Sequence, residues 1–395
     1  MKLKTYTLFT LMALLLWACQ KDELSLKTAN RGDIIEVKTN GYLTKSEVEE
    51  RINEFSAQDW AEYDLSLISI TYRTEYMGKP IDTRGLIIIP NGIDTVDLIM
   101  HCHGTEIPSK LLHADNITPS LYTGSTDNYR EVRNMGLGWA SKGFVVFIPD
   151  YIGYGLTLGK EHPYMYFPEM FLSNIDGLLA VKKYLSENNY SYDNQLFLTG
   201  WSLGGGACLS AHKYIQEQYA AAFTVAASSS LAGVLNYEKY HDKSLKSGNE
   251  KLGVMPIISW SVYSINKFSP LKRPTDQIYS YPVFDQMSSI VVPSFQPNKV
   301  FKPYFLSKVL DGTDTQYRTI LTQNSFYKNW TATGKVFLHH GDADDTVPYY
   351  NSTDAKEGLE ASGSDVTLYT YTGGNHDTEL GNFIKNTFND FNQLR

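Results

Sequence analysis

The stretch that decides the fold is Gly200-Trp201-Ser202-Leu203-Gly204. It follows a predicted strand that ends near Leu198, precedes a predicted helix that begins near Gly205, and matches the pattern G-x-S-x-G. A strand that turns directly into a helix leaves room only for small residues two positions before and after the serine, and the turn lifts the hydroxyl above the sheet. The N-terminus of the helix adds positive potential beside it. Ser202 is therefore predicted to be a nucleophile.

A serine hydroxyl attacks at neutral pH only when a base lies within hydrogen-bond reach and a third group orients that base. In folds that carry this motif, the chain order is serine, acid, histidine. His376 fits this order, because it follows the last predicted strand and precedes the last predicted helix. Of the other histidines after the serine, one lies in the next helix, one lies in a long insertion, and two end a strand and are expected to be structural: His212, His241, His339 and His340.

Three aspartates precede this histidine, in the stretch Gly341-Asp342-Ala343-Asp344-Asp345-Thr346-Val347-Pro348. With His340 in front, the stretch resembles the hydrolase pattern H-G-x-x-D-x-x-V-P, and that alignment selects Asp344 as the acid. Asp342 and Asp345 are then expected to be solvated or to cap the loop, as carboxylates in turns commonly do. His340 is expected to support the loop.

Two backbone N–H groups are needed to hold a negative oxygen that develops in the reaction. One is expected from Leu203, and the other from the loop after an early strand, where His101-Cys102-His103-Gly104-Thr105 stands. Gly104 would let the backbone approach a substrate, and Thr105 is the candidate donor. Metal binding by the first three residues of that run is the alternative. Adjacent side chains on a strand alternate between faces and no other ligand cluster completes a site, so no metal and no cofactor is expected.

Predicted strands and helices alternate along the chain, which indicates an α/β fold with a mostly parallel central sheet flanked by helices. A helix from Leu43 to Trp60, with Thr44 and Glu47 as a capping box, and a hairpin of Leu65–Tyr72 and Gly85–Pro90 are expected to come first. Buried strands are predicted at 96–100, 144–148, 195–198, 222–226, 335–338 and 366–370. Helices are predicted at 171–188, 205–218, 352–362 and 378–392.

The stretch from about 228 to 330 interrupts this alternation. It is rich in Tyr, Phe, Pro and Ser, with short helix-like pieces, and it is too long for a plain loop. It either pads the fold or forms a helical cap over the active site. The cap is favoured because the stretch follows the carboxyl end of a strand, where the sites of α/β sheets lie.

The N-terminus has the features of a secretion signal. Lys2 and Lys4 precede a short apolar run, and Ala18-Cys19 follows it. A small residue before a cysteine resembles a bacterial lipoprotein signal, in which the cysteine is lipidated and becomes the new N-terminus. Gln20-Lys21-Asp22-Glu23 resembles the short signal that sends some Gram-negative lipoproteins to the cell surface. An ordinary signal peptide that contains a cysteine is the alternative.

These features divide the chain into a signal peptide at 1–18, a polar tether at 19–42 and one hydrolase-like domain at 43–395. The expected location is extracytoplasmic, on the outer membrane or cell surface through a lipid on Cys19. The formal net charge of -8 argues against a nucleic-acid partner. Cys102 and Cys208 are either paired as a disulfide or, as is more usual for isolated cysteines, buried thiols.

From about Leu65 to the C-terminus the chain resembles the α/β-hydrolase superfamily. Within it, the segment from Pro149 to Gly155 together with His162-Pro163-Tyr164 looks like bacterial esterases and secretory lipases, in which this loop shapes the rim of the pocket. The resemblance implies hydrolysis of small-molecule or polymer-linked carboxylic esters through an acyl-enzyme. The residues beside the nucleophile, Trp201 and Leu203, are commoner in esterases than in true triglyceride lipases.

Two other functions fit the same residues. A peptidase of the prolyl-oligopeptidase type shares the triad and its order, but such enzymes usually carry a large N-terminal propeller, and here only the tether and one helix precede the first predicted strand. A non-enzymatic surface lipoprotein could use a hydrolase scaffold to bind glycan or lipid, since fold alone does not prove activity.

Overall fold

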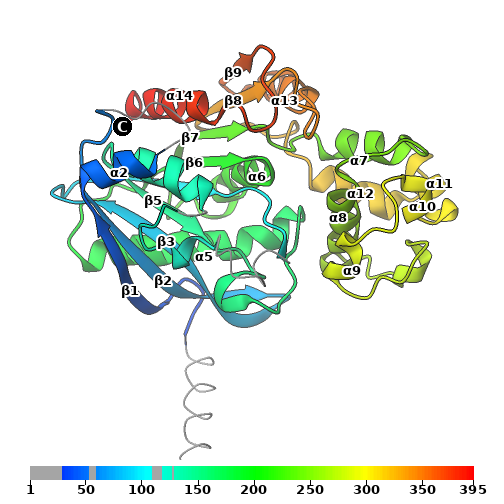
Figure 1. The fold of residues 1–395 in the computed structure, drawn as a ribbon, viewed down its shortest axis with the longest axis horizontal. Helices are drawn as coiled ribbons and strands as arrows, with labels where there is room; N and C mark the ends of the chain where they lie inside the picture. The colour runs from blue at the N-terminus through cyan, green and yellow to red at the C-terminus, as the bar shows by residue number, and fades with distance from the viewer. Residues whose placement is uncertain (1–28, 53–58, 109–117, 127–128) are drawn as a thin grey trace, which may run out of the picture.

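The computed structural model describes residues 29–52, 59–108, 118–126 and 129–395, so the predicted signal peptide and Cys19 lie outside the described residues (Figure 1). Within these residues the strands form one nine-stranded sheet in the order β1-β2-β3-β5-β4-β6-β7-β8-β9. The strands are β1 (Ile34–Leu43), β2 (Leu65–Tyr76), β3 (Lys79–Pro90), β4 (Asp97–Cys102), β5 (Phe144–Pro149), β6 (Gln195–Trp201), β7 (Thr224–Leu231), β8 (Lys335–Gly341) and β9 (Val366–Tyr371).

In sheet order, the six strands β5, β4, β6, β7, β8 and β9 are parallel to one another. Strands β1, β2 and β3 are mutually antiparallel, and β3 pairs with β5 in the antiparallel sense. The predicted hairpin and all six predicted buried strands are present. Runs of β-branched and aromatic residues form these strands because both faces of the sheet are covered, so alternation with polar residues is not required. The expectation of a mostly parallel sheet flanked by helices is confirmed.

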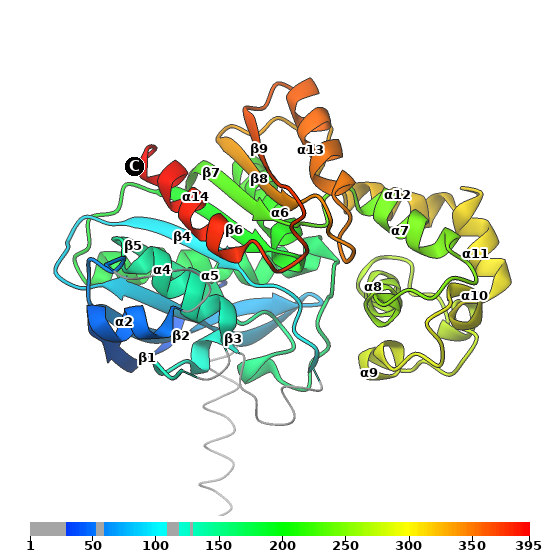
Figure 2. The same ribbon diagram turned by 45° about the horizontal axis from the view of Figure 1, so that its top comes forward.

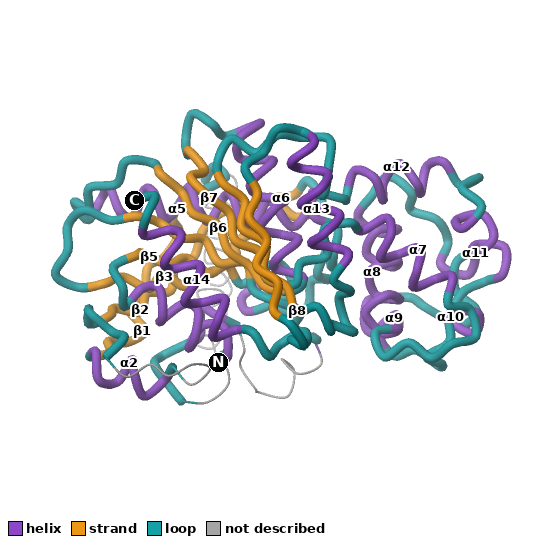
Figure 3. Tube along the Cα trace, turned by 90° about the horizontal axis from the view of Figure 1, so that it is seen from above, coloured by secondary structure: helices purple, strands orange, loops and turns teal. Residues whose placement is uncertain are grey.

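Helices cover both faces of the sheet, as seen along it in Figure 3. Side chains of α5, α6 and α13 join the apolar core of one face, and those of α4 and α14 join the core of the other. Among the helices of the described ranges, none is long and apolar enough to cross a membrane. The flanking helices are α2 (Lys45–Arg51), α4 (Leu137–Ala140), α5 (Phe167–Glu187), α6 (Leu203–Gln218), α13 (Tyr350–Ala361) and α14 (Leu380–Asn392).

The N-terminal region differs from the prediction in two ways. The segment Ile34–Leu43, expected to lie mostly within an irregular tether at 19–42, forms β1 and pairs with β2. Most of its side chains are exposed, so its sequence lacks the continuous apolar run that marks a buried strand. The helix expected from Leu43 to Trp60 ends at Arg51, because Ile52 has extended backbone angles, and residues 53–58 of that expectation lie outside the described residues. Its predicted capping box, Thr44 with Glu47, is present.

The long insertion is helical, as expected, and leaves the sheet at the carboxyl end of β7 (Figures 1 and 2). It begins later than predicted, because β7 continues through Ser228 to Leu231 along its neighbour β6. The insertion is called the cap below and spans residues 232–334. Its helices are α7 (Tyr237–Lys246), α8 (Met255–Phe268), α9 (Gln286–Ile290), α10 (Pro297–Val300), α11 (Pro303–Leu310) and α12 (Thr315–Gln323).

Packing between the sheet and α5 depends on a glycine. Phe147, at the centre of β5, is fully buried, and a Cβ atom on Gly177 of α5 would lie 2.4 Å from its Cζ atom. The ring therefore occupies the space that a side chain at Gly177 would need, which brings the helix close to the sheet.

Gly177→Ala is expected to lower the free energy of unfolding by about 1–3 kcal/mol, because overpacking outweighs the gain in helix propensity of roughly 1 kcal/mol. Urea unfolding measures this change. The control is Gly253→Ala, where an added Cβ atom meets no neighbour within 4 Å, and there the change is expected to stay within about 0.5 kcal/mol. A Gly177→Ala variant as stable as the parent would contradict this account of the packing.

Candidate active site

The predicted site residues lie in four loops at one edge of the sheet. Thr105 follows β4, Ser202 follows β6, Asp344 follows β8 and His376 follows β9. The strands end side by side, since Cys102 pairs with Gly200, Leu231 with His339, and Gly341 with Tyr371. Parallel strands thus deliver residues that are distant in sequence to the same place, which is the usual position of a site in such sheets.

Ser202 occupies a strained turn between β6 and α6. Its backbone angles are φ 58° and ψ -119°, outside the regions that residues with a side chain ordinarily adopt. Close contacts hold the turn: a Cβ atom on Gly200 would lie 2.0 Å from the carbonyl oxygen of Gly204, and one on Gly204 would lie 1.8 Å from that of Cys102. The Ser202 N–H donates to the carbonyl of Leu231, 2.9 Å away. The predicted small residues are therefore required sterically.

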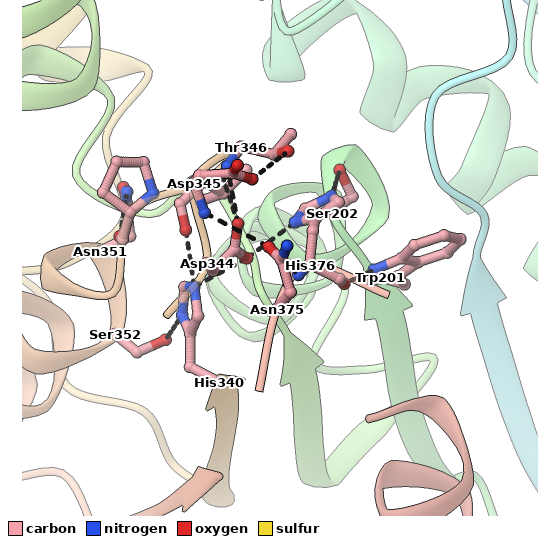
Figure 4. A network of polar contacts seen from close by, with 12 residues as sticks. Trp201, Ser202, His340, Asp344, Asp345, Thr346, Asn351, Ser352, Asn375 and His376 are labelled. Carbon is pink, nitrogen blue, oxygen red and sulfur yellow. Dashed lines mark hydrogen bonds and ion pairs between the residues drawn. The ribbon is translucent and has the colours of Figure 1, made fainter. Parts of the chain in front are cut away.

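The structure brings Ser202, His376 and Asp344 into one hydrogen-bonded row (Figure 4). The Ser202 Oγ lies 2.9 Å from His376 Nε2, and His376 Nδ1 lies 2.8 Å from Asp344 Oδ2. Because an ionised carboxylate only accepts, Nδ1 carries the proton in this arrangement and Nε2 can accept the proton of the serine. The side chain of His376 is 15% exposed and Ser202 is partly exposed, so solvent and substrate can reach the reacting end of the row.

Asp344 is buried and hydrogen-bonded on both oxygens. Oδ1 accepts from the N–H groups of Thr346 and Val347, each at 2.9 Å, and Oδ2 faces both His376 and His340 Nε2, the latter at 3.3 Å. Burial alone would raise the pKa of this carboxyl, but the hydrogen bonds from His340 and His376 outweigh it and hold the pKa well below its usual range. Asp344 therefore stays ionised and keeps the proton of His376 on Nδ1.

His340 supports the loop as expected and also takes part in holding the acid. Its Nε2 lies 2.7 Å from the carbonyl oxygen of Val347, which can only accept, so this nitrogen carries the proton. Its Nδ1 then accepts from the hydroxyl of Ser352, 2.7 Å away. The proton on Nε2 also faces Asp344 Oδ2, so His340 stabilises the negative charge of Asp344 while His376 keeps its own hydrogen bond to that oxygen.

The two neighbouring aspartates point elsewhere. Asp342 and Asp345 are exposed, and Asp342 accepts from the N–H of Gly373 at 2.7 Å, which is a loop-capping contact. Among the three aspartates of the loop, the contact with His376 is made by Asp344, the residue that the match to the pattern H-G-x-x-D-x-x-V-P selected.

Trp201, which the sequence reasoning did not single out as a site residue, holds the histidine loop. Its Nε1 donates to the carbonyl of His376 at 2.9 Å, and the two rings lie 5.6 Å apart (Figure 4). The residue beside Ser202 thus holds the loop that carries His376. The sequence signal for this role was only its place next to Ser202.

The loop after β4 lies against the turn that carries the nucleophile. The N–H of Gly104 donates to both oxygens of Glu131, at 2.8 and 3.0 Å, so it is already hydrogen-bonded within the protein, and the next N–H along the chain is that of Thr105. Glu131 is also buried and contacts His101 Nε2 at 3.0 Å. Sequence reasoning did not identify Glu131, because nothing in its local sequence distinguishes it.

The run that offered an alternative as metal ligands has other partners. His101 lies between Glu131 and Thr199, while His103 is bonded through Nδ1 to the carbonyl of Gly104 and stacks on Tyr151. In the described part of the chain, no three His, Cys, Asp or Glu side chains are grouped so that they could hold a metal ion. Cys102 and Cys208 are free buried thiols, and burial raises the pKa of Cys102 to about 12.

The remaining histidines after the serine are buried away from this row. His212 of α6 bonds Ser228, and His241 in the cap bonds the hydroxyl of Tyr317. His339 stacks on Tyr369 with the ring centres 4.5 Å apart. All three are structural.

One family model matches the C-terminal part of the chain. The prolyl oligopeptidase family matches residues 278–392, a span that includes Asp344 and His376. No curated protein matches the chain significantly in sequence.

Solved structures resemble most of the chain. A protein from Legionella pneumophila described as a hydrolase has a TM-score of 0.76 and 21% identity, with 91% of this chain and 98% of that one covered. The rice cell wall degrading esterase LipA from Xanthomonas oryzae has a TM-score of 0.74 and 19% identity, with coverage of 92% and 100%. Candida antarctica lipase A has a TM-score of 0.60 and 15% identity, with coverage of 89% and 79%.

At these identities the structural likeness establishes the fold, which is the predicted α/β-hydrolase fold. The family match and these neighbours together support a serine hydrolase.

Asp344→Asn is expected to lower kcat by a factor on the order of 10⁴, because an amide can donate to His376 Nδ1 and would then favour the wrong tautomer. Steady-state hydrolysis kinetics on a chromogenic substrate measure the loss. Asp342→Asn and Asp345→Asn are matched controls, and each should leave kcat within about two-fold of the parent, as expected for exposed positions. A large loss in either control with little loss in Asp344→Asn would reassign the acid.

Proposed function

We propose that the protein is a serine esterase that cleaves carboxylic esters through an acyl-enzyme. The observation that carries this proposal is the hydrogen-bonded row from Ser202 Oγ through His376 to Asp344, at 2.9 and 2.8 Å. This row has a strained serine at its exposed end and an ionised carboxylate at its buried end, which is the arrangement that activates a serine for acyl transfer.

In the proposed mechanism, His376 Nε2 takes the proton of Ser202 as Oγ attacks the ester carbonyl and the C=O electron pair moves onto oxygen. The tetrahedral intermediate collapses, the bond to the alcohol oxygen breaks, and His376 returns the proton to that oxygen. Water then attacks the acyl-enzyme with the same base, and the carboxylic acid leaves as Ser202 regains its proton. Asp344 keeps the imidazole oriented and stabilises the imidazolium.

The oxyanion is assigned to the N–H groups of Leu203 and Thr105. Leu203 is the first residue of α6, so its N–H has no partner within the helix and lies at the positive end of the helix dipole. Two contacts support Thr105: the close approach of Gly204 to Cys102, which places the β4 loop beside the serine turn, and the use of the Gly104 N–H by Glu131. One donor then comes from the first turn of α6 and the other from the loop after β4.

A peptidase is the second candidate, and the observation that favours it is the match to the prolyl oligopeptidase family. That match covers residues 278–392 and leaves out Ser202, whereas the esterase LipA aligns with 92% of the chain. The esterase is therefore preferred. An oxyester also has a better leaving group than an amide, so the same triad cleaves it more readily. A binding protein without activity is ranked last, because all three side chains of the row are present and in contact.

Ser202→Ala is expected to reduce turnover of a short-chain p-nitrophenyl ester by a factor of about 10³ or more, because the nucleophile is lost while the fold is retained. It should also abolish covalent labelling by a fluorophosphonate. The matched control is Ser210→Ala, which removes a buried hydroxyl of α6 that bonds the carbonyl of Ala207.

Three outcomes separate the candidates. Labelling and ester turnover that depend on Ser202 support the esterase. Faster turnover of a proline-containing anilide than of any ester would make the chain a peptidase. Absence of labelling in the folded parent protein would leave only a binding function.

The location is proposed from the N-terminal sequence, in which Ala18-Cys19 follows a short apolar run. In a Gram-negative host that expresses the full chain, Cys19→Ser is expected to release the protein from the membrane fraction, because the lipid-bearing thiol is absent. Cell fractionation and metabolic labelling with a fatty acid measure the change. The control is Cys208→Ser, since that thiol is buried in the fold. Release of neither variant, with no lipid incorporated by the parent, would contradict the anchor.

A further inference from the structure

We propose that Tyr164 is a positioning residue for the oxyanion donor Thr105, and that Trp260 of the cap holds Tyr164 in place. The hydroxyl of Tyr164 lies 2.7 Å from Thr105 Oγ1. Tyr164 stands in the segment between β5 and α5, and Thr105 stands after β4, so the contact joins two loops at the edge where the triad lies.

The loop at 103–106 is held by side chains from several directions. Tyr151 donates its hydroxyl to the carbonyl of His103 at 3.1 Å, Tyr154 donates to that of Glu106 at 2.6 Å, and Glu131 accepts from the N–H of Gly104. Thr105 is held through its own side chain by Tyr164. An N–H group stabilises an oxyanion only when it points at the position that the oxygen will occupy, so the orientation of this residue determines its contribution.

Tyr164 is fully buried, and burial raises the pKa of its phenol well above the ordinary value. The group therefore stays protonated at neutral pH and can donate to Thr105 Oγ1. The hydroxyl of Tyr164 contacts the side chain of Thr105, so its effect on the reaction passes through Thr105.

The cap supports Tyr164 from the other side. The ring of Trp260, on α8, is stacked on that of Tyr164, with the centres 3.9 Å apart and the planes 5° from parallel. Two further cap residues hold His162, which lies two residues before Tyr164. Ser264 donates to the carbonyl of His162 at 3.4 Å, and Gln286 accepts from the N–H of His162 at 2.9 Å. The cap thus contacts Tyr164 through Trp260, and Tyr164 contacts Thr105, so the position of the cap influences the position of Thr105.

Burial of Trp260 is not explained by hydrogen bonding. Its ring is 1% exposed, yet its Nε1 has no hydrogen-bond partner among the described residues. A buried N–H without a partner costs free energy, and a phenylalanine or leucine at this position would avoid that cost. Trp260 therefore contributes through its flat indole surface, and that surface faces Tyr164.

The decisive variant is Tyr164→Phe, which removes one oxygen and leaves the stacked ring. Its kcat on a p-nitrophenyl ester is expected to fall by a factor on the order of ten, with KM within about two-fold, because a misplaced oxyanion donor weakens the transition state alone. The matched control is Tyr279→Phe, which removes a buried cap hydroxyl that donates to the carbonyl of Ser259 at 2.7 Å. It should change neither constant, and thermal unfolding checks that both variants are folded.

A double-mutant cycle tests whether Tyr164 acts through Thr105. Thr105→Val keeps the backbone N–H and removes Oγ1, so the double variant with Tyr164→Phe should lose about as much kcat as either single variant, not the product of the two losses. Trp260→Leu should lower kcat in the parent and have little effect in the Tyr164→Phe background. Additive losses in either cycle, a Tyr164→Phe kcat within two-fold of the parent, or an effect on KM alone would overturn the proposal.

Because this role rests on the proposed ester hydrolysis, the second readout is the rate at which a fluorophosphonate modifies Ser202. If the parent protein is labelled but turns over no ester, the proposed function fails. The labelling rates of the parent and of the same variants then still measure how well each oxyanion site is oriented. If ester turnover is present and Tyr164→Phe matches the parent in both readouts, the positioning role fails while the esterase stands.

Discussion

The contact on which the rest of the site depends is the meeting of three backbone segments at the serine turn. Gly200, Gly204 and Cys102 approach so closely that no side chain fits between them, and this crowding holds Ser202 at a positive φ. One steric constraint therefore fixes Ser202, the first turn of α6 and the loop after β4 together. The strain is maintained by the sheet, because Cys102 and Gly200 end two adjacent strands that pair with each other, and Gly204 lies in the first turn of α6 directly after them.

The electrostatics of the site follow from the same edge of the sheet. Asp344 is removed from water but is met by two backbone N–H groups and two histidines, so its charge is retained where it orients the base. His340 and His376 are chemically alike, yet their partners give them different roles: a carbonyl fixes the proton of His340 on Nε2, whereas Asp344 fixes that of His376 on Nδ1 and leaves its Nε2 to face the serine.

The sequence was informative where structure follows from local pattern. Buried strands appear as continuous apolar runs, and the G-x-S-x-G turn is recognisable because its glycines have no substitute. The edge strand β1 was missed because its side chains face water, and the extent of the first helix was overestimated because nothing in its polar sequence marks an end. Glu131 and Trp260 could not be found this way, and Tyr164 was noted only within the segment expected at the rim of the pocket. Each contacts the loop after β4, or a residue that does, across a long separation in sequence, and no short pattern records such a contact.

The cap joins the sheet through two chain connections, between β7 and β8, as Figure 2 shows. Insertions at such loops are ordinarily the part of a fold that evolution lengthens or replaces without disturbing the strands. Here the inserted helices also supply Trp260, Ser264 and Gln286 to the segment that precedes α5. A lineage that exchanged this cap would also have to replace these supports, so a change in the inserted helices would reach the segment before α5 as well.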